Sequence, residues 1–138
     1  MSNTKTLFEK IVAGEIPSYK IYEDAHTFAF LDINPASHGH TLVIPKMPYV
    51  NIHEMPDDVA AALIHAVKKV SSAVKAATKA DAIKLIMNNG AAAGQIIFHA
   101  HMHVIPRHEN DGVRSGVYKK YADGQADAIA ASIRAEIK

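Results

Sequence analysis

Three histidines near the C-terminal third of the chain alternate with apolar residues. Four of the nine histidines fall between residues 99 and 108. Successive side chains of a β-strand point to opposite faces, so His99, His101 and His103 would share one face. The alanine, methionine and valine that follow them would share the other, which predicts that this second face packs on the core. Neutral imidazoles suit neither a core nor a solvated surface, so three on one face indicate chemistry.

Metal binding is one chemistry that this pattern allows. Residues two apart on a strand lie roughly 6.8 Å apart, so neighbouring rings could share an ion held at about 2.0–2.1 Å from each nitrogen. The outer pair would lie roughly 13 Å apart, which rigid imidazoles do not easily bridge. A metal site would therefore need His40 or His108 to complete it.

Covalent catalysis at phosphorus is the other. Imidazole is a competent nucleophile that titrates near neutrality, and a hydrogen bond to its second nitrogen can orient it. The flanking histidines can donate to phosphate oxygens or to a leaving group. Asn88, Gly90, Gly94 and Gln95 lie just upstream, where amides and small residues allow a phosphate to approach. The two glycines are not a Walker loop, because no Lys-Ser/Thr follows them.

The remaining patterns predict an α+β fold. Thr6 and Glu9 form a capping box for a short helix that stops at Gly14. A stripe of valine and leucine at three- and four-residue spacing predicts a long helix over 56–78, and three isoleucines mark a C-terminal helix. Strands are expected over 19–23, 27–32, 41–44, 83–87 and 96–105. Because strands and helices do not alternate, we expect one domain, residues 1–138, with a largely antiparallel five-stranded sheet.

Composition restricts the partners and the location. The sequence has no cysteine, which excludes disulfides and thiolate metal sites and suits a cytoplasmic protein. Fifteen basic and fourteen acidic residues leave a net charge of +1, too little for the clustered basic face that duplex nucleic acid needs. No run approaches the roughly 20 apolar residues of a membrane span. We therefore expect neither a nucleic-acid nor a membrane partner.

The histidine run resembles the signature of the histidine-triad (HIT) superfamily, in which three histidines alternate with apolar residues. Further segments match in one collinear register over about residues 6–108, and the opening segment is similar to the Hint branch of bacterial-type nucleotide hydrolases. The matching segments are Leu7–Pro17, Phe30–Pro35, His40–Lys46, Met87–Gly90, Gly94–Gln95 and His99–Ile105. Residues 109–138 form an extension without a clear motif.

The resemblance implies an activity and roles for the histidines. Proteins of this superfamily are homodimers with a sheet continued across the interface, and they hydrolyse purine nucleotide derivatives at the α-phosphate. His101 would be the nucleophile that forms a nucleotidyl-histidine, and His99 would help to orient it. His103 would contact the phosphate and assist the leaving group, with His40 behind the triad.

The resemblance also implies a substrate-binding set. Asp32 would accept the ribose hydroxyls, and Asn88 and Gln95 would hold the α-phosphate. The nucleobase would lie between apolar side chains, namely Leu7, Phe8, Ile11, Phe30 and Ile33. Ile96 follows Gln95 where relatives often place a serine or threonine, so one phosphate donor is missing here.

A structural zinc is not expected. Many bacterial relatives bind one through a Cys-x-x-Cys pair and a histidine, whereas this chain has Thr6, Glu9 and Pro48 at those positions. We therefore predict no cofactor, with the capping box fixing the N-terminal helix instead.

Four functions stay open at this point. The leading prediction is a nucleoside phosphoramidase. The alternatives are a dinucleoside polyphosphate hydrolase, a nucleotide-binding or adaptor module with vestigial activity, and a metalloenzyme.

Overall fold

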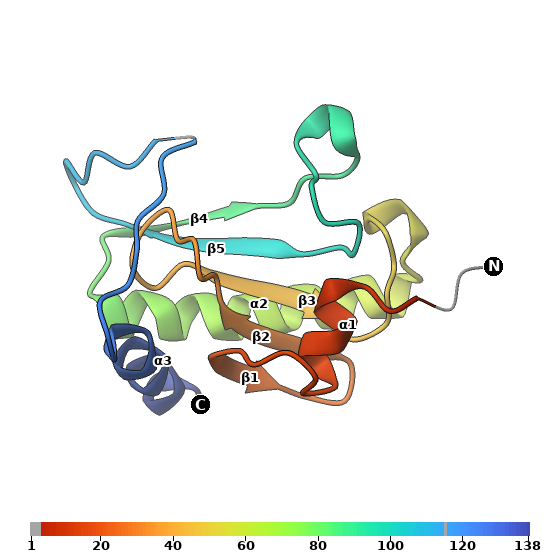
Figure 1. The fold of residues 1–138 in the computed structure, drawn as a ribbon, viewed down its shortest axis with the longest axis horizontal. Helices are drawn as coiled ribbons and strands as arrows, with labels where there is room; N and C mark the ends of the chain where they lie inside the picture. The colour runs from red at the N-terminus through yellow and green to blue at the C-terminus, as the bar shows by residue number, and fades with distance from the viewer. Residues whose placement is uncertain (1–3, 115) are drawn as a thin grey trace.

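The computed structural model describes residues 4–114 and 116–138 (Figure 1). Its five strands form one sheet in the order β1-β2-β3-β5-β4, in which every neighbouring pair is antiparallel. The α+β class, the five-stranded sheet and the three expected α-helices are confirmed. The elements are α1 Leu7–Val12, β1 Lys20–Glu23, β2 Thr27–Leu31, β3 Thr41–Pro45, η1 Ile52–Glu54, α2 Asp57–Thr78, β4 Ala82–Ile86, η2 Ala91–Ala93, β5 Met102–Arg107 and α3 Gln125–Glu136.

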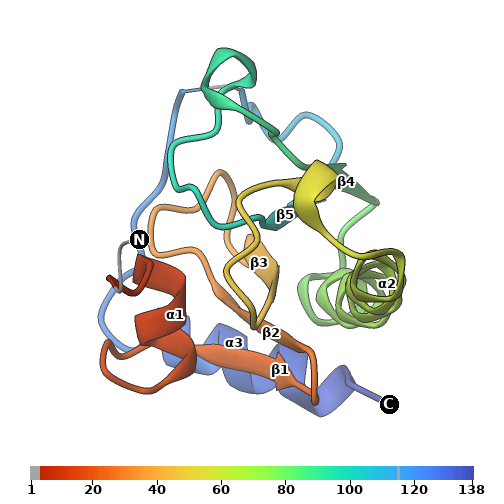
Figure 2. The ribbon, with the colours of Figure 1, turned by 90° about the vertical axis from the view of Figure 1, so that its right-hand side faces the viewer.

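The two faces of the sheet are covered differently. Figure 2 shows α1 on one side of the strands and α2 on the other. The α2 side holds the larger core, in which Leu63, Val67 and Val70 of the helix pack against Val43 and Val104 of the sheet. The α1 side holds a smaller cluster of aromatic and aliphatic residues from α1, β2 and β3. The second face is therefore covered only in part, and this leaves room for a site.

The short helix α1 begins as the sequence predicts. Thr6 Oγ1 accepts a hydrogen bond from the Glu9 backbone N–H at 3.0 Å, and Glu9 Oε1 accepts one from the Thr6 N–H at 2.9 Å. A helix of six residues has little stability of its own, so this reciprocal cap and the burial of Phe8 and Ile11 must hold it.

The fifth strand differs from its predicted range of 96–105. The β5 ladder begins only at Met102 and runs to Arg107, because the preceding segment leaves the sheet: the Ala100 N–H donates to Tyr49 O in a loop. The alternation of side chains nevertheless holds, since Ala100 and Val104 lie in the core on the α2 side. The three histidines consequently share the other face, with only His103 inside the strand.

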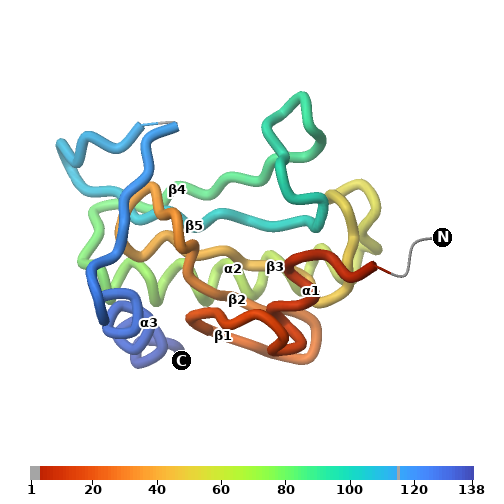
Figure 3. Tube along the Cα trace, in the orientation of Figure 1, coloured from red at the N-terminus to blue at the C-terminus, as the bar shows by residue number. Residues whose placement is uncertain are grey.

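The C-terminal extension packs on the same core as the sheet. In Figure 3 the segment after β5 runs past the loop between β2 and β3 and then enters α3. Ala126, Ala130 and Ile133 of α3 are buried against α2, and Arg134 donates to Lys20 O of β1 at 2.7 Å. No helix among the described residues is long and apolar enough to cross a membrane.

Gly39, just before His40, is held in a conformation that other residues rarely adopt. Its φ is +103°, and a Cβ there would lie 2.7 Å from Thr78 Cγ2 and 3.3 Å from Pro106 Cγ. We expect Gly39→Ala to lower the free energy of unfolding by about 3 kcal/mol, because backbone strain and overpacking add. Gly14→Ala is the matched control, since Gly14 has φ +79° with nothing within 4 Å of a Cβ; we expect about 1 kcal/mol there. Equal losses in urea unfolding would contradict the role given to the contact with Thr78.

Candidate active site

A cavity of about 520 Å³ opens on the α1 side of the sheet, beside the histidines. Its lining comes from α1, the ends of β2 and β3, the loops that precede β5, and the C-terminal extension. Ten of the twelve predicted site residues line it: Leu7, Phe8, Ile11, Phe30, Asp32, Ile33, His40, Asn88, His101 and His103. The fold thus gathers residues from positions 7 to 103 around one space.

His101 is oriented by its own neighbour in the chain. Its Nδ1 lies 2.7 Å from the backbone carbonyl of His99. A carbonyl can only accept, so Nδ1 carries the proton, and Nε2 keeps the lone pair. The Phe8 ring packs edge-on against the imidazole with the ring centroids 5.1 Å apart. The ring is therefore fixed with an unprotonated nitrogen available to a substrate in the cavity.

His103 and His40 form a second hydrogen-bonded pair. The Ala36 N–H donates to His40 Nδ1 at 3.0 Å, so the proton of His40 is on Nε2. That Nε2–H lies 2.9 Å from His103 Nδ1 and donates to it. His103 must then carry its own proton on Nε2. The Ala36 N–H thus determines that His103 presents a hydrogen-bond donor at Nε2. His101 presents an acceptor at its Nε2.

The electrostatics keep all four imidazoles neutral. Burial, together with the nearby charges of His103 and His101, lowers the pKa of His40 to about 3. Burial and the charge of His101 lower the pKa of His103 to about 4. Burial also lowers the pKa of His99 and of His101, against the opposing effect of the hydrogen bonds to Pro45 O and His99 O. The neutral tautomers given by the hydrogen bonds are consistent with these shifts.

His99 does not line the cavity, and its side chain connects the site to α1. Its Nε2–H donates to Pro45 O at 2.7 Å, so its Nδ1 is an acceptor and lies 2.8 Å from Thr6 Oγ1. The Thr6 hydroxyl therefore accepts from Glu9 and donates to His99. The Thr6 hydroxyl thus takes part both in the cap of α1 and in a hydrogen bond to His99, the residue whose carbonyl orients His101.

This shared hydroxyl predicts a graded effect of substitutions at Thr6. We expect Thr6→Val to lower the free energy of unfolding by about 2 kcal/mol, because it removes the cap and leaves His99 Nδ1 unpaired. Thr6→Ser keeps both hydrogen bonds and should stay within about 0.5 kcal/mol of the wild type. Glu9→Ala is the control, since it breaks the capping box and keeps the hydrogen bond between Thr6 and His99. Equal losses from Thr6→Val and Glu9→Ala in denaturant unfolding would show that the bond to His99 contributes nothing.

Asp32 uses one carboxylate oxygen locally and presents the other toward the histidines. Oδ1 accepts from the Asn34 N–H at 2.9 Å, which closes the turn after β2. Oδ2 lies 3.7 Å from His40 Nε2. Burial raises the pKa of the carboxyl, although the hydrogen bond from Asn34 lowers it. Asp32 thus caps a turn and still offers an acceptor to a ligand.

The two predicted phosphate-binding amides differ in their surroundings. Asn88 lines the cavity, and its amide has no hydrogen-bond partner among the described residues. Gln95 is buried, donates to Val50 O at 2.6 Å and Ile97 O at 3.0 Å, and accepts from the Gly90 N–H. Both N–H donors of Gln95 are in use, so the structure gives it a bracing role in the loop. It leaves Asn88 as the free amide.

Part of the lining comes from residues that the sequence patterns do not indicate. Tyr118 of the C-terminal extension lies at the cavity although its side chain is 62% exposed. The extension is anchored beside it, because the Lys119 N–H donates to Pro35 O at 2.7 Å and Tyr121 stacks on His38. No periodicity or motif in residues 109–124 could have revealed this. Ile16, Leu42 and Ile97 add apolar area and read as ordinary core in the sequence.

The three positions at which relatives bind zinc do not fit a metal here. The Thr6 hydroxyl is committed to Glu9 and His99, Glu9 Oε1 accepts from the Thr6 N–H, and Pro48 has no side-chain ligand atom. Asp32, His40 and His103 do offer ligand atoms within 4.8 Å of one another. The Ala36 N–H, however, requires the proton of His40 on Nε2, which removes the lone pair that a metal would need. The hydrogen bonds favour a proton network over a metal centre.

Comparison with known proteins agrees with this geometry. The family model "HIT domain" matches residues 13–110. An adenylylsulfatase of Arabidopsis thaliana is 50% identical over 105 residues, which are 76% of this chain and 53% of that protein. This chain therefore spans about half the length of that relative. An adenosine 5′-monophosphoramidase of Candida albicans is 37% identical over 110 residues, 77% of this chain and 72% of that protein.

Solved structures share the fold over nearly the whole chain. A Hit-like protein from Bartonella henselae superposes with a TM-score of 0.86 and 36% identity, covering 99% of both chains. Another is a hypothetical histidine triad nucleotide-binding protein from Sulfolobus tokodaii, with a TM-score of 0.86 and 40% identity over 94% of this chain and 90% of that one. The predicted resemblance is confirmed, and the chain belongs to the histidine-triad (HIT) family of nucleotide-binding and nucleotide-hydrolysing proteins.

Proposed function

We propose that this protein hydrolyses purine nucleotide derivatives at the α-phosphate through a covalent nucleotidyl-His101, and that it is a nucleoside phosphoramidase. The observation that carries the proposal is the orientation of His101: its Nδ1–H is held by His99 O, which leaves Nε2 free, and the residue lines a cavity large enough for a nucleotide. Two relatives, named adenylylsulfatase and adenosine 5′-monophosphoramidase, support cleavage of the bond between the α-phosphorus and the leaving group.

In this proposal each region of the cavity takes one part of the nucleotide. The base lies among Leu7, Phe8, Ile11, Phe30 and Ile33, whose apolar surfaces favour a flat ring. Asp32 Oδ2 accepts from the ribose hydroxyls. Asn88 and the His103 Nε2–H donate to oxygens of the α-phosphate, where negative charge grows in the transition state. Gln95 acts indirectly by holding the loop.

The reaction then proceeds in two steps, formation of the nucleotidyl-histidine and its hydrolysis. His101 Nε2 attacks the α-phosphorus, the bond from phosphorus to the leaving group breaks, and the leaving atom departs with the electron pair. A basic leaving atom takes up a proton from solvent, which the attacking water returns in the second step. The His101 Nδ1–H bond to His99 O stabilises the positive imidazolium of the intermediate. Water next attacks the same phosphorus, the phosphorus–nitrogen bond breaks, and the nucleoside monophosphate and a proton are released. His40 is a positioning residue here, because it fixes the tautomer of His103.

The activity is tested by release of AMP from adenosine 5′-phosphoramidate, with EDTA present and no metal added. We expect the wild type to release AMP at an undiminished rate under chelation, because no step needs a metal. His101→Ala should bind AMP and release none from the phosphoramidate. Absence of release from the wild type would overturn the phosphoramidase and favour a dinucleoside polyphosphate hydrolase or a binding role. Loss of activity on chelation would overturn the metal-free mechanism.

We also propose that the protein is a homodimer that joins its sheets through β4, and that it acts in the cytoplasm. Strand β4 lies at one end of the sheet order, so one of its edges has no strand partner among the described residues, and Leu85 on it is 48% exposed. The cysteine-free sequence suits a reducing compartment. Analytical ultracentrifugation of the wild type and of Leu85→Lys tests the interface. A monomeric wild type would contradict it.

A further inference from the structure

A second cavity, of about 490 Å³, adjoins the first at the His40–His103 pair. It shares four lining residues with the nucleotide cavity: His40, Asn88, His103 and Tyr118. The remaining lining comes from β4, β5, the C-terminal extension and Ala36 of the loop after β2. If the nucleoside fills the first cavity and the phosphate lies at His101 and His103, this adjoining space is available to the group beyond the phosphate.

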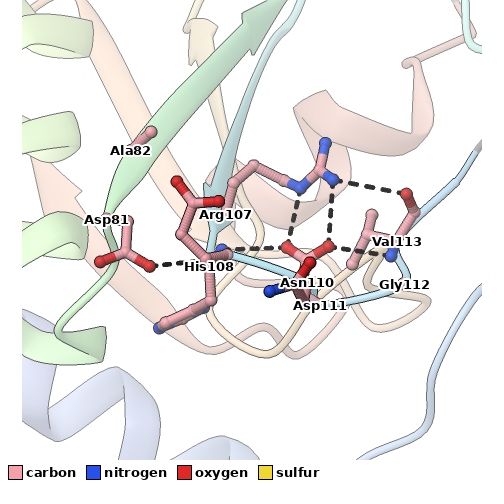
Figure 4. A pocket seen from close by; sticks show the side chains of 9 residues that line it. Asp81, Ala82, Arg107, His108, Asn110, Asp111, Gly112 and Val113 are labelled. Carbon is pink, nitrogen blue, oxygen red and sulfur yellow. Dashed lines mark hydrogen bonds and ion pairs between the residues drawn. The ribbon is translucent and has the colours of Figure 1, made fainter.

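The charges around this second cavity all have one sign. Lys84, Arg107 and Arg114 line it, and no described aspartate or glutamate does. Arg107 is neutralised from outside, because its Nε and Nη2 donate to the Asp111 carboxylate at 2.9 and 3.0 Å (Figure 4), which also holds the pKa of that carboxyl well below its usual range. Lys84 and Arg114 have no side-chain partner among the described residues. The cavity therefore carries two uncompensated positive charges.

Uncompensated cations beside a departing group act on its charge. They stabilise a leaving group that carries negative charge, and the effect grows as the bond breaks. They give no such help to ammonia, which leaves neutral. The two cations thus change the choice among substrates that share one nucleotidyl half, while leaving the attack by His101 unaltered.

We propose that Lys84 and Arg114 form a leaving-group subsite for an oxyanion, sulfate or phosphate, and that these two cations speed the cleavage of nucleotide anhydrides beside that of phosphoramidates. This inference rests on the function proposed above. His101 Nε2 attacks the α-phosphorus, the bond to the bridging oxygen breaks, and the oxyanion leaves with the electron pair into the cationic cavity. Water then releases the nucleoside monophosphate from His101 as before.

Three substrates with the same adenylyl group test this: adenosine 5′-phosphosulfate, ADP and adenosine 5′-phosphoramidate. The variant Lys84→Met/Arg114→Gln removes both charges and keeps most of the side-chain volume. We expect its kcat/KM to fall by at least about tenfold on one or both anhydrides, since bonds to charged groups are worth this much each. It should stay within about twofold of the wild type on the phosphoramidate. Lys68→Met, on the exposed face of α2, is the matched control and should change nothing.

The outcomes separate the inference from the proposed function. A selective loss on phosphosulfate identifies sulfate as the leaving group, a selective loss on ADP identifies phosphate, and losses on both identify a general oxyanion subsite. Equal changes on all three substrates, or no change on any, would overturn the subsite and leave the proposed function standing. A wild type that cleaves none of the three would overturn both.

Discussion

Replacing His101 by glycine is expected to lower kcat by at least about 10⁴-fold, with the affinity for AMP retained. The reason is specific to the geometry: His101 supplies the free Nε2 in the cavity, whereas the nucleotide is held by groups that the substitution leaves in place. Single-turnover kinetics with adenosine 5′-phosphoramidate and calorimetric titration with AMP measure the two quantities.

A matched variant and chemical rescue make this result specific. His65→Gly alters an exposed histidine of α2 and should keep kcat within about twofold, provided that it folds. Free imidazole should restore part of the activity of His101→Gly, because it can enter the space vacated by the ring. A His101→Gly protein with substantial activity of its own would show that another group attacks the phosphorus.

Acidification is expected to destabilise the folded protein well above the range in which most carboxylates titrate. The unfolded chain binds protons at its histidines as the pH falls through about 6.5. The folded chain does not, because burial lowers the pKa of His103 to about 4 and that of His40 to about 3, and lowers those of His99 and His101 as well. Between about pH 6.5 and the lowered pKa values of the folded state, the unfolded state binds more protons than the folded state. The free energy of unfolding therefore decreases as the pH decreases through this range. The raised pKa of Asp32 acts in the opposite direction.

Urea unfolding at a series of pH values measures this effect. We expect His40 and His103 alone to lower the free energy of unfolding by about 2 kcal/mol from about pH 6 to about pH 5. In His40→Gln/His103→Gln the curve should be flatter over this range, while in His65→Gln it should keep the wild-type slope. A double variant with the wild-type slope would contradict neutral, buried imidazoles at these two positions.

The parts of the site that the sequence predicts are those encoded by local patterns. The alternation of His99, His101 and His103 with apolar residues determines which face each side chain takes, and the core on the α2 side confirms it. The capping box of Thr6 and Glu9 is likewise a contact within one turn of helix. Such features need no knowledge of distant residues.

The parts that the sequence could not predict depend on distant pairings. The residue type of Gln95 suggests a phosphate ligand. Its side-chain amide instead donates to Val50 O, 45 residues away, and this contact holds the loop together. The Thr6 hydroxyl is hydrogen-bonded to His99, which lies 93 residues later in the sequence. Tyr118 and Arg114 come from an extension without periodicity, and only the folded chain places them beside His103.

The covalent intermediate is the most direct test of the mechanism. The protein would be mixed with adenosine 5′-phosphosulfate or adenosine 5′-phosphoramidate, quenched rapidly under alkaline conditions that preserve phosphorus–nitrogen bonds, and digested for mass spectrometry. We predict one adenylyl group on the peptide that contains His101, assigned to that residue by fragmentation and lost in His101→Ala. Hydrolysis of the substrate with no adenylyl group on the wild-type protein, or with the group on another residue, would contradict nucleophilic attack by His101.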